Sequence, residues 1–166
     1  MNKGIGRHIV GLVVEDKPGV MQRIAGMFTR RGFNIDTITV GKSETPGLSR
    51  ITLTMTADED TLEQLIKQLY KIIEVIRVFK MGDKGSVVRE LCLVKVHIKD
   101  DDARYEVMKY SDVFKGKIVD ISPSSTTIQL VGTSEKIDDL LDMLRPFGMK
   151  EVVRTGIVAM SRDPKK

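Results

Sequence analysis

Residues 15–20 (EDKPGV) combine the residue types in this chain best suited to bind a small charged molecule. They follow a run rich in Ile and Val, residues 8–14, which predicts a strand, and they precede a helical pattern. Pro18 fits the first turn of a helix, where its missing N–H is no loss, and Gly19 lets the backbone approach a ligand. Free amides at a helix start attract a carboxylate or a phosphate.

Asp16 brings the opposite charge to this turn, because its carboxylate attracts a cation. A ligand that carries both charges close together, such as a free amino acid, matches this mixture better than a phosphate does. The alternative is that Asp16 is only a helix N-cap and that Pro18 and Gly19 only make a tight turn. These six residues alone leave both interpretations open.

Groups able to make or break bonds are scarce in the rest of the chain. A hydrolase or transferase needs a nucleophile and a base, yet His8 and His97 lie in predicted strands with apolar neighbours, which indicates structural roles. Cys92, within LCLV, is expected to be a small buried side chain. Residues 100–102 (DDD) fit a helix start better than a metal site. The sequence contains no P-loop or dinucleotide motif, and it predicts no catalytic residue and no metal site.

Composition restricts the remaining classes of protein. The 166 residues, 41% of them hydrophobic, suffice for one domain or two small ones. No apolar run approaches the roughly 18 residues of a membrane span, and no leader pattern is present, so we expect a cytoplasmic protein with no membrane contact. The net charge of +4 is spread, with 12 Lys/Arg against 9 Asp/Glu in residues 1–80 and 15 against 14 in residues 81–166. Nucleic-acid binding is therefore not expected.

The first half of the chain alternates strand and helix patterns. After the turn, Val20, Ile24 and Phe28 recur every four residues and predict one apolar stripe on a helix. Residues 30–32 (RRG) end this helix with two cations and a cap glycine. Residues 33–40 predict a strand whose apolar face switches halfway along, which suggests a bulge or a strand covered on both sides.

Later elements complete a β-α-β-β-α-β order. They are a turn at residues 45–47 (TPG), a strand over 48–55, a helix from 58–61 and a strand over 72–79. Asp60 and Glu63 have the spacing of a capping box at the start of the second helix.

The second half repeats this order. Its predicted elements are a strand over 87–98, a helix over 100–112, strands over 117–121 and 126–131, a helix from Ser134 and a strand near 152–153. The apolar set Ile137, Leu140, Leu141 and Leu144 reproduces Leu62, Leu65, Ile66 and Leu69 at a constant offset of 75 residues.

This repetition predicts an α+β fold of two tandem ferredoxin-like βαββαβ domains. We expect a first domain over residues 1–81, a linker over 82–86, a second domain over 87–161 and a tail over 162–166. The second half has no counterpart to the Pro-Gly turn. Any binding at that turn is therefore a property of the first domain.

Residues 15–28 and 30–40 closely resemble the ACT domain of the regulatory (small) subunit of acetolactate synthase, also called acetohydroxyacid synthase. Further matches to this family cover nearly the whole chain. They are residues 48–52 (LSRIT), 89–91 (REL), 117–120 (KIVD), 132–134 (GTS) and 154–156 (RTG).

The resemblance implies a protein with no catalysis of its own. Such subunits bind the large catalytic subunit, raise its activity and confer feedback inhibition by valine or a related branched-chain amino acid. Thiamine diphosphate, Mg and FAD are expected on the catalytic subunit, and no cofactor is expected in this chain. The family is dimeric through its ACT domains.

The resemblance also implies where the effector binds, namely between the Pro-Gly turn of one chain and the start of the second strand of the other. Carried onto this sequence, the backbone at Gly19 and the amide of Asn34 hold the charged groups, and Val20 and Ile35 line a pocket for a branched side chain. The full implied set is Asp16, Pro18, Gly19, Val20, Asn34 and Ile35. Family members often have Asn where this chain has Asp16, which leaves the identity of the effector open.

Two other functions are compatible with this fold. A free-standing ACT-type amino-acid sensor would regulate another enzyme or transcription, but transcriptional control calls for a DNA-reading element, and no helix-turn-helix segment is evident. A small ferredoxin-like enzyme, such as an acyl-phosphate hydrolase, would turn over its substrate without a partner.

Overall fold

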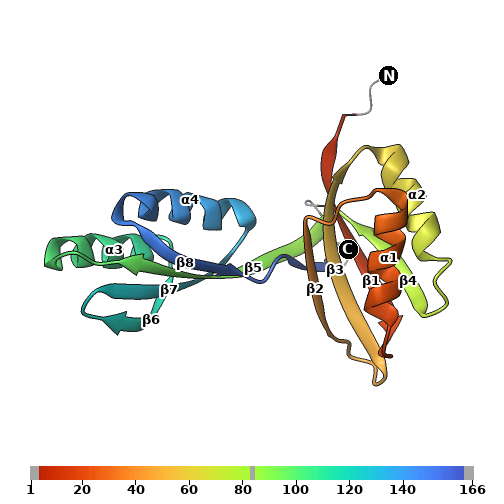
Figure 1. The fold of residues 1–166 in the computed structure, drawn as a ribbon, viewed down its shortest axis with the longest axis horizontal. Helices are drawn as coiled ribbons and strands as arrows, with labels where there is room; N and C mark the ends of the chain where they lie inside the picture. The colour runs from red at the N-terminus through yellow and green to blue at the C-terminus, as the bar shows by residue number, and fades with distance from the viewer. Residues whose placement is uncertain (1–3, 83–84, 163–166) are drawn as a thin grey trace. The chain divides into compact units, whose positions relative to one another are not determined.

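The structure, a computed structural model, describes residues 4–82 and 85–162. The chain forms two compact units. The N-terminal unit comprises the residues up to Val87 together with those from Ile157 onward, and the C-terminal unit is Val88–Gly156. In each unit the helices lie on one face of an antiparallel sheet (Figure 1).

The N-terminal unit has the ferredoxin-like order that the sequence predicts. Its elements are β1 (Gly6–Glu15), α1 (Val20–Arg31), β2 (Thr37–Lys42), β3 (Leu48–Ala57), α2 (Glu59–Leu69) and β4 (Val75–Met81). The strands lie in the order β2-β3-β1-β4, and each neighbouring pair is antiparallel. This order confirms the predicted fold class for the first half.

Helix α1 forms where the apolar spacing places it. Val20, Ile24 and Phe28 are all at most 3% exposed, and they pack in one core with side chains from β1, β3 and α2. Gly32 ends the helix in the left-handed conformation, with φ of 68°. Only glycine adopts this conformation at little cost, which explains why the chain turns there.

Strand β2 begins at Thr37, four residues later than predicted. Phe33 and Ile35 lie in the preceding loop, where both pack against the core. The switch of apolar face in residues 33–40 therefore marks the start of the strand, and the prediction of one continuous strand was wrong.

Two further boundaries differ from those expected. Strand β4 begins at Val75 because residues 70–74 form a turn. The N-cap of α2 is Asp58, whose side chain accepts a hydrogen bond from the N–H of Thr61 at 2.7 Å, so the capping box assigned from Asp60 was wrong. A preceding cap in extended conformation satisfies the first amides better than a residue within the helix does.

The C-terminal unit repeats the fold. Its elements are β5 (Ser86–His97, which begins in the N-terminal unit), α3 (Asp101–Val113), β6 (Lys117–Ser122), β7 (Ser125–Gly132), α4 (Ser134–Leu144), the short 3-10 helix η2 (Arg145–Phe147) and β8 (Met149–Arg154). The strand order is β6-β7-β5-β8. The predicted equivalence of α2 and α4, 75 residues apart, is confirmed because the matching side chains are all at most 1% exposed. They are Leu62, Leu65 and Leu69 in α2 and Ile137, Leu140 and Leu144 in α4.

The end of the chain contains a strand that the sequence did not indicate. Strand β9 (Val158–Ser161) follows the C-terminal unit and groups with the N-terminal one, whereas the expected second domain ran from 87 to 161. Residues 83–84 of the expected linker and 163–166 of the expected tail lie outside the described residues. Within the described chain, no helix has the length and apolar character needed to cross a membrane.

Gly11 in β1 gives a test of packing on the sheet face opposite the helices. A Cβ built at Gly11 would lie 2.1 Å from a ring carbon of Phe79, so we expect Gly11→Ala to displace the ring and lower the free energy of unfolding by about 1–3 kcal/mol. Gly41 in β2 has open space around its Cβ position and is the matched control. Denaturant unfolding of both variants measures the effect, and equal losses would contradict this packing.

Candidate ligand-binding site

The turn between β1 and α1 is held by the backbone on both sides. The N–H of Glu15 donates to the carbonyl of Glu74 at 2.9 Å, and the N–H of Asp16 donates to the carbonyl of Gly47 at 2.8 Å. The turn is therefore anchored to the segment before β4 and to the β2–β3 hairpin. These two backbone bonds hold the turn in place.

Gly19 is the N-cap of α1. Its φ of 86° lies in the left-handed region, and no side chain caps the helix. The alternative that Asp16 is the N-cap is wrong, and Pro18 precedes the cap instead of occupying the first helical turn. A residue with a Cβ would be strained at this position.

Amides at the start of α1 are left without acceptors. The N–H of Val20 reaches the carbonyl of Lys17 at 3.4 Å, but the N–H groups of Gly19, Met21 and Gln22 donate to no residue that the structure describes. They point along the positive end of the helix dipole. The start of α1 can therefore accept a carboxylate or phosphate.

The other α-helices of the described chain begin differently. Side chains of Asp58, Asp100 and Thr133 cap α2, α3 and α4, and each of these helices has an acidic residue in its first turn. Helix α1 has neither feature. In α2, α3 and α4 a side chain of the same chain accepts a hydrogen bond from one of the first amides. In α1 the corresponding amides have no such acceptor.

Charged side chains surround the turn. Arg23 pairs with Glu74 (Nη2 to Oε1, 2.8 Å), and Lys17 pairs with Glu15 (Nζ to Oε2, 2.7 Å). The hydrogen bond and the charge of Glu15 raise the pKa of Lys17 above its ordinary value. Asp16 is exposed, and its carboxylate contacts no polar partner among residues 4–82 and 85–162. Asp16 thus lies three residues before the N-cap of α1, so one short turn carries both a carboxylate and the open amides.

Asn34 and Ile35 follow Gly32, which caps the opposite end of α1. Asn34 is exposed, and Ile35 is half-buried against the core. A helix of 12 residues is about 18 Å long, which is far more than the length of an amino acid. Gly19 and Asn34 of one chain therefore cannot contact the same amino acid.

The side chain of Val20 is not available at the surface of the described chain. It is 3% exposed and belongs to the core between α1 and the sheet. The structure thus brings together Asp16, Pro18 and Gly19, places Val20 beneath them, and separates all four from Asn34 and Ile35.

The histidine and cysteine nearest to reactive chemistry are held in the fold. Nε2 of His8 lies 2.9 Å from the carbonyl of Ala57. Cys92 is buried, and burial raises the pKa of its thiol. Among the described residues, no three His, Cys, Asp or Glu side chains form a group that could hold a metal ion.

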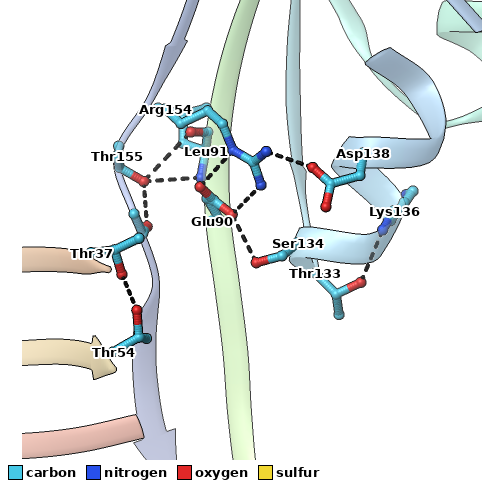
Figure 2. Close-up of polar contacts among 11 residues, drawn as sticks. Thr37, Thr54, Glu90, Leu91, Thr133, Ser134, Lys136, Asp138, Arg154 and Thr155 are labelled. Atoms are coloured by element: carbon cyan, nitrogen blue, oxygen red, sulfur yellow. Dashed lines mark hydrogen bonds and ion pairs between the residues drawn. The ribbon is translucent and has the colours of Figure 1, made fainter. Parts of the chain in front are cut away.

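A buried ion pair in the C-terminal unit was missed from the sequence. Figure 2 shows Arg154 of β8 bridging Glu90 of β5 and Asp138 of α4. Nε and Nη2 of Arg154 each donate to a carboxylate oxygen of Glu90 at 2.8 Å, and Nη1 donates to Asp138 at 2.5 Å. The hydroxyl of Ser134 also donates to Glu90, which is only 3% exposed. The hydrogen bond that Arg154 donates to Glu90 raises the pKa of the guanidinium above its ordinary value.

This cluster joins segments that are far apart in the chain. Glu90, Ser134 and Arg154 come from residues 89–91, 132–134 and 154–156, three of the stretches that carry the family resemblance. The family resemblance of these three stretches is the sequence signal that could have pointed to this site. No spacing rule links residues on β5, α4 and β8. The pair fastens two neighbouring strands to the start of a helix.

Comparison with known protein families gives two matches that together span most of the chain. Residues 10–77 match the family described as the AHAS small subunit-like ACT domain. Residues 89–163 match the family described as the small subunit of acetolactate synthase.

Individual relatives agree with these matches. The chain is 54% identical to a Methanothermobacter thermautotrophicus protein named "Probable acetolactate synthase small subunit", over 93% of this chain and 92% of that protein. It is 41% identical to the acetolactate synthase small subunit of Mycolicibacterium smegmatis, over 99% and 96% of the two chains. The crystal structure of the small subunit from Thermotoga maritima matches with a TM-score of 0.89 and 42% identity, over 95% and 98% of the chains.

Removing Glu90 should destabilise the C-terminal unit. Glu90→Ala leaves Arg154 without its main partner, and we expect a loss of about 3 kcal/mol, the low end for a broken buried pair, because Arg154 is 30% exposed and keeps Asp138. Glu151→Ala is the control, since Glu151 is 61% exposed and should contribute at most about 1 kcal/mol through Lys95. The reactivity of the single thiol, Cys92, during denaturant unfolding reports on this unit. Similar losses in both variants would show that the buried pair has no special role.

Proposed function

Since the chain belongs to the family of acetolactate synthase small subunits, we propose that it is the regulatory subunit of that enzyme and does no catalysis itself. In this proposal it binds the large catalytic subunit, raises its activity and makes it sensitive to valine or a related branched-chain amino acid. The observation that carries the proposal is the match of both units, over nearly their full lengths, to small subunits. Thiamine diphosphate, Mg and FAD belong to the catalytic subunit.

The effector site that we propose lies at the start of α1. The open amides near Gly19 bind the effector carboxylate, and Asp16 attracts its ammonium group. A buried zwitterion needs partners for both charges, because an unpaired buried charge is costly. The uncapped start of α1, and an Asp16 carboxylate that pairs with nothing in the described part of the chain, support this assignment.

Asn34 and Ile35 complete the site from a second copy of the chain. The length of α1 prevents both ends of one helix from reaching the same amino acid, so two chains must contribute. We therefore propose a homodimer through the N-terminal units. Strand β2 lies at the edge of its sheet, and an edge strand is a common place for a second copy of a chain to pair.

Side-chain selectivity at this site should be modest. In this proposal Ile35 contacts the branched side chain of the effector, whereas Val20 supports the turn from the core. One methylene changes affinity by about 1 kcal/mol, which separates valine, leucine and isoleucine by less than tenfold.

Regulation then follows from unequal binding. The effector shifts the enzyme only if it binds one arrangement of the regulatory dimer more tightly than another. The catalytic subunit responds to the arrangement that is favoured.

Co-purification tests the proposed role directly. The chain, mixed with the acetolactate synthase catalytic subunit of the same organism, should form a stable complex with higher acetolactate synthase activity than the catalytic subunit alone. Activity that stays at the level of the catalytic subunit, with no complex, would reject the proposal. Turnover of an acyl phosphate by the purified chain alone would support a ferredoxin-like hydrolase instead.

Gly19→Asp should weaken feedback inhibition in the reconstituted enzyme. The new carboxylate would compete with the effector for the open amides, and we expect the valine concentration for half-inhibition to rise about tenfold or more, equal to about 1.4 kcal/mol. Asn34→Ala should act in the same direction because it removes a polar partner from the second chain. Activation of the catalytic subunit should remain in both variants.

Gly148→Asp is the matched control for backbone strain. Gly148 has φ of 88°, almost the same as Gly19, but lies in the C-terminal unit. It should leave the valine response unchanged. If valine inhibits the unmodified enzyme and both the Gly19→Asp and the Asn34→Ala variants equally, the site assignment is wrong. The proposed regulatory role would still stand.

A further inference from the structure

The last described residues return to the N-terminal unit. In this segment, Ile157 and Ala159 are 3% and 7% exposed, whereas the alternate residues Val158 and Met160 are 47% and 65% exposed. Successive side chains of an extended segment point to opposite sides. One side of residues 157–160 therefore lies against the protein, and the other faces solvent.

Polar contacts hold this segment along its length. Nη2 of Arg50, on β3, donates to the carbonyl of Ala159 at 3.4 Å. The N–H of Arg162 donates to the carbonyl of Gly85 at 2.9 Å, and its Nε donates to the carbonyl of Ser86 at 3.4 Å. Strand β9 also contacts β4 and pairs with β5. Arg50, Gly85, Ser86 and all of β4 precede Val88 and belong to the N-terminal unit.

The surface beneath Ala159 is built in layers. On the sheet face away from the helices, the ring of Phe79 lies over Gly11, which pairs with it across β1 and β4. The guanidinium of Arg50 lies 4.8 Å from the centre of that ring. Arg50 is therefore held between an aromatic ring and the backbone of β9, a favourable position for a planar cation.

Two apolar side chains on the sheet face away from the helices are also buried. Ile9 and Met81 pair across β1 and β4, on the same side as Gly11 and Phe79, and are 5% and 4% exposed. Neither belongs to the core that the helices cover. Apolar side chains on an open sheet face would be exposed to water unless another segment lay over them.

We propose that residues 157–162 form a strap that closes the open face of the N-terminal sheet. The effector-binding unit is then completed by the last residues of the chain, after the C-terminal unit. An N-terminal unit that lacked residues 157–162 would be without this cover. The chain passes between the units twice, at Val87–Val88 and at Gly156–Ile157, so each unit is tied to the other through both β5 and the strap.

Ala159→Asp in the full-length chain tests the strap. A carboxylate at this buried position should lift the strap, and we expect amide hydrogen exchange in β1 and β4 to accelerate about tenfold or more. Exchange in β7 and the reactivity of Cys92, both reporters of the C-terminal unit, should change less than about twofold. Met160→Asp is the matched control, because Met160 is exposed on the same strand. This substitution should leave exchange in β1, β4 and β7 and the reactivity of Cys92 unchanged.

A milder variant keeps the test informative if Ala159→Asp does not fold. Arg50→Gln removes the cation over Phe79 and should accelerate exchange about threefold in β4 and β9 alone. Unchanged exchange in β1 and β4 of Ala159→Asp, or equal acceleration in both units, would overturn the strap. These outcomes are independent of the valine response, so they distinguish failure of the strap from failure of the proposed regulatory function.

Discussion

The left-handed backbone at Gly19 is the constraint on which the proposed site depends. It starts α1 without a side-chain cap, and bonds from Glu15 and Asp16 to the carbonyls of Glu74 and Gly47 hold the turn in that shape. The first amides of the helix are consequently open to an anion, because their usual capping partner is absent. A residue with a side chain at this position would strain the turn, because its φ is 86°.

The two units show how one topology supports different tasks. The strand-to-helix turn of the C-terminal unit is closed by Asp100, whose carboxylate accepts from the N–H of Ala103. That helix start has its own anion and does not need one from solution. The C-terminal unit instead contains the ion pair of Glu90 and Arg154. Together with Ser134 and Asp138, this pair joins β5, β8 and α4. This difference is why the proposed effector site lies in the N-terminal unit alone.

The length of α1 links the site to assembly. Residues at its two ends are about 18 Å apart, so one small effector can use both only when two chains meet. Binding then changes the free energy of the pair of chains, which is the condition for an effect on a partner subunit. The strap places the end of the chain on the same N-terminal unit, so that unit is also connected twice to the C-terminal one.

Local patterns in the sequence determined the elements whose signals lie within a few residues. The stripe of Val20, Ile24 and Phe28 and the cap at Gly32 sufficed for α1, and the offset of 75 residues sufficed for the repeated fold. Tertiary structure alone decided that Phe33 and Ile35 pack from a loop, that Glu90 meets Arg154 across 64 residues, and that β9 returns to the N-terminal unit. The physical reason is that periodicity and turn chemistry act between near neighbours, whereas strand pairing and buried charge pairs join residues whose separation in sequence carries no information about their contact.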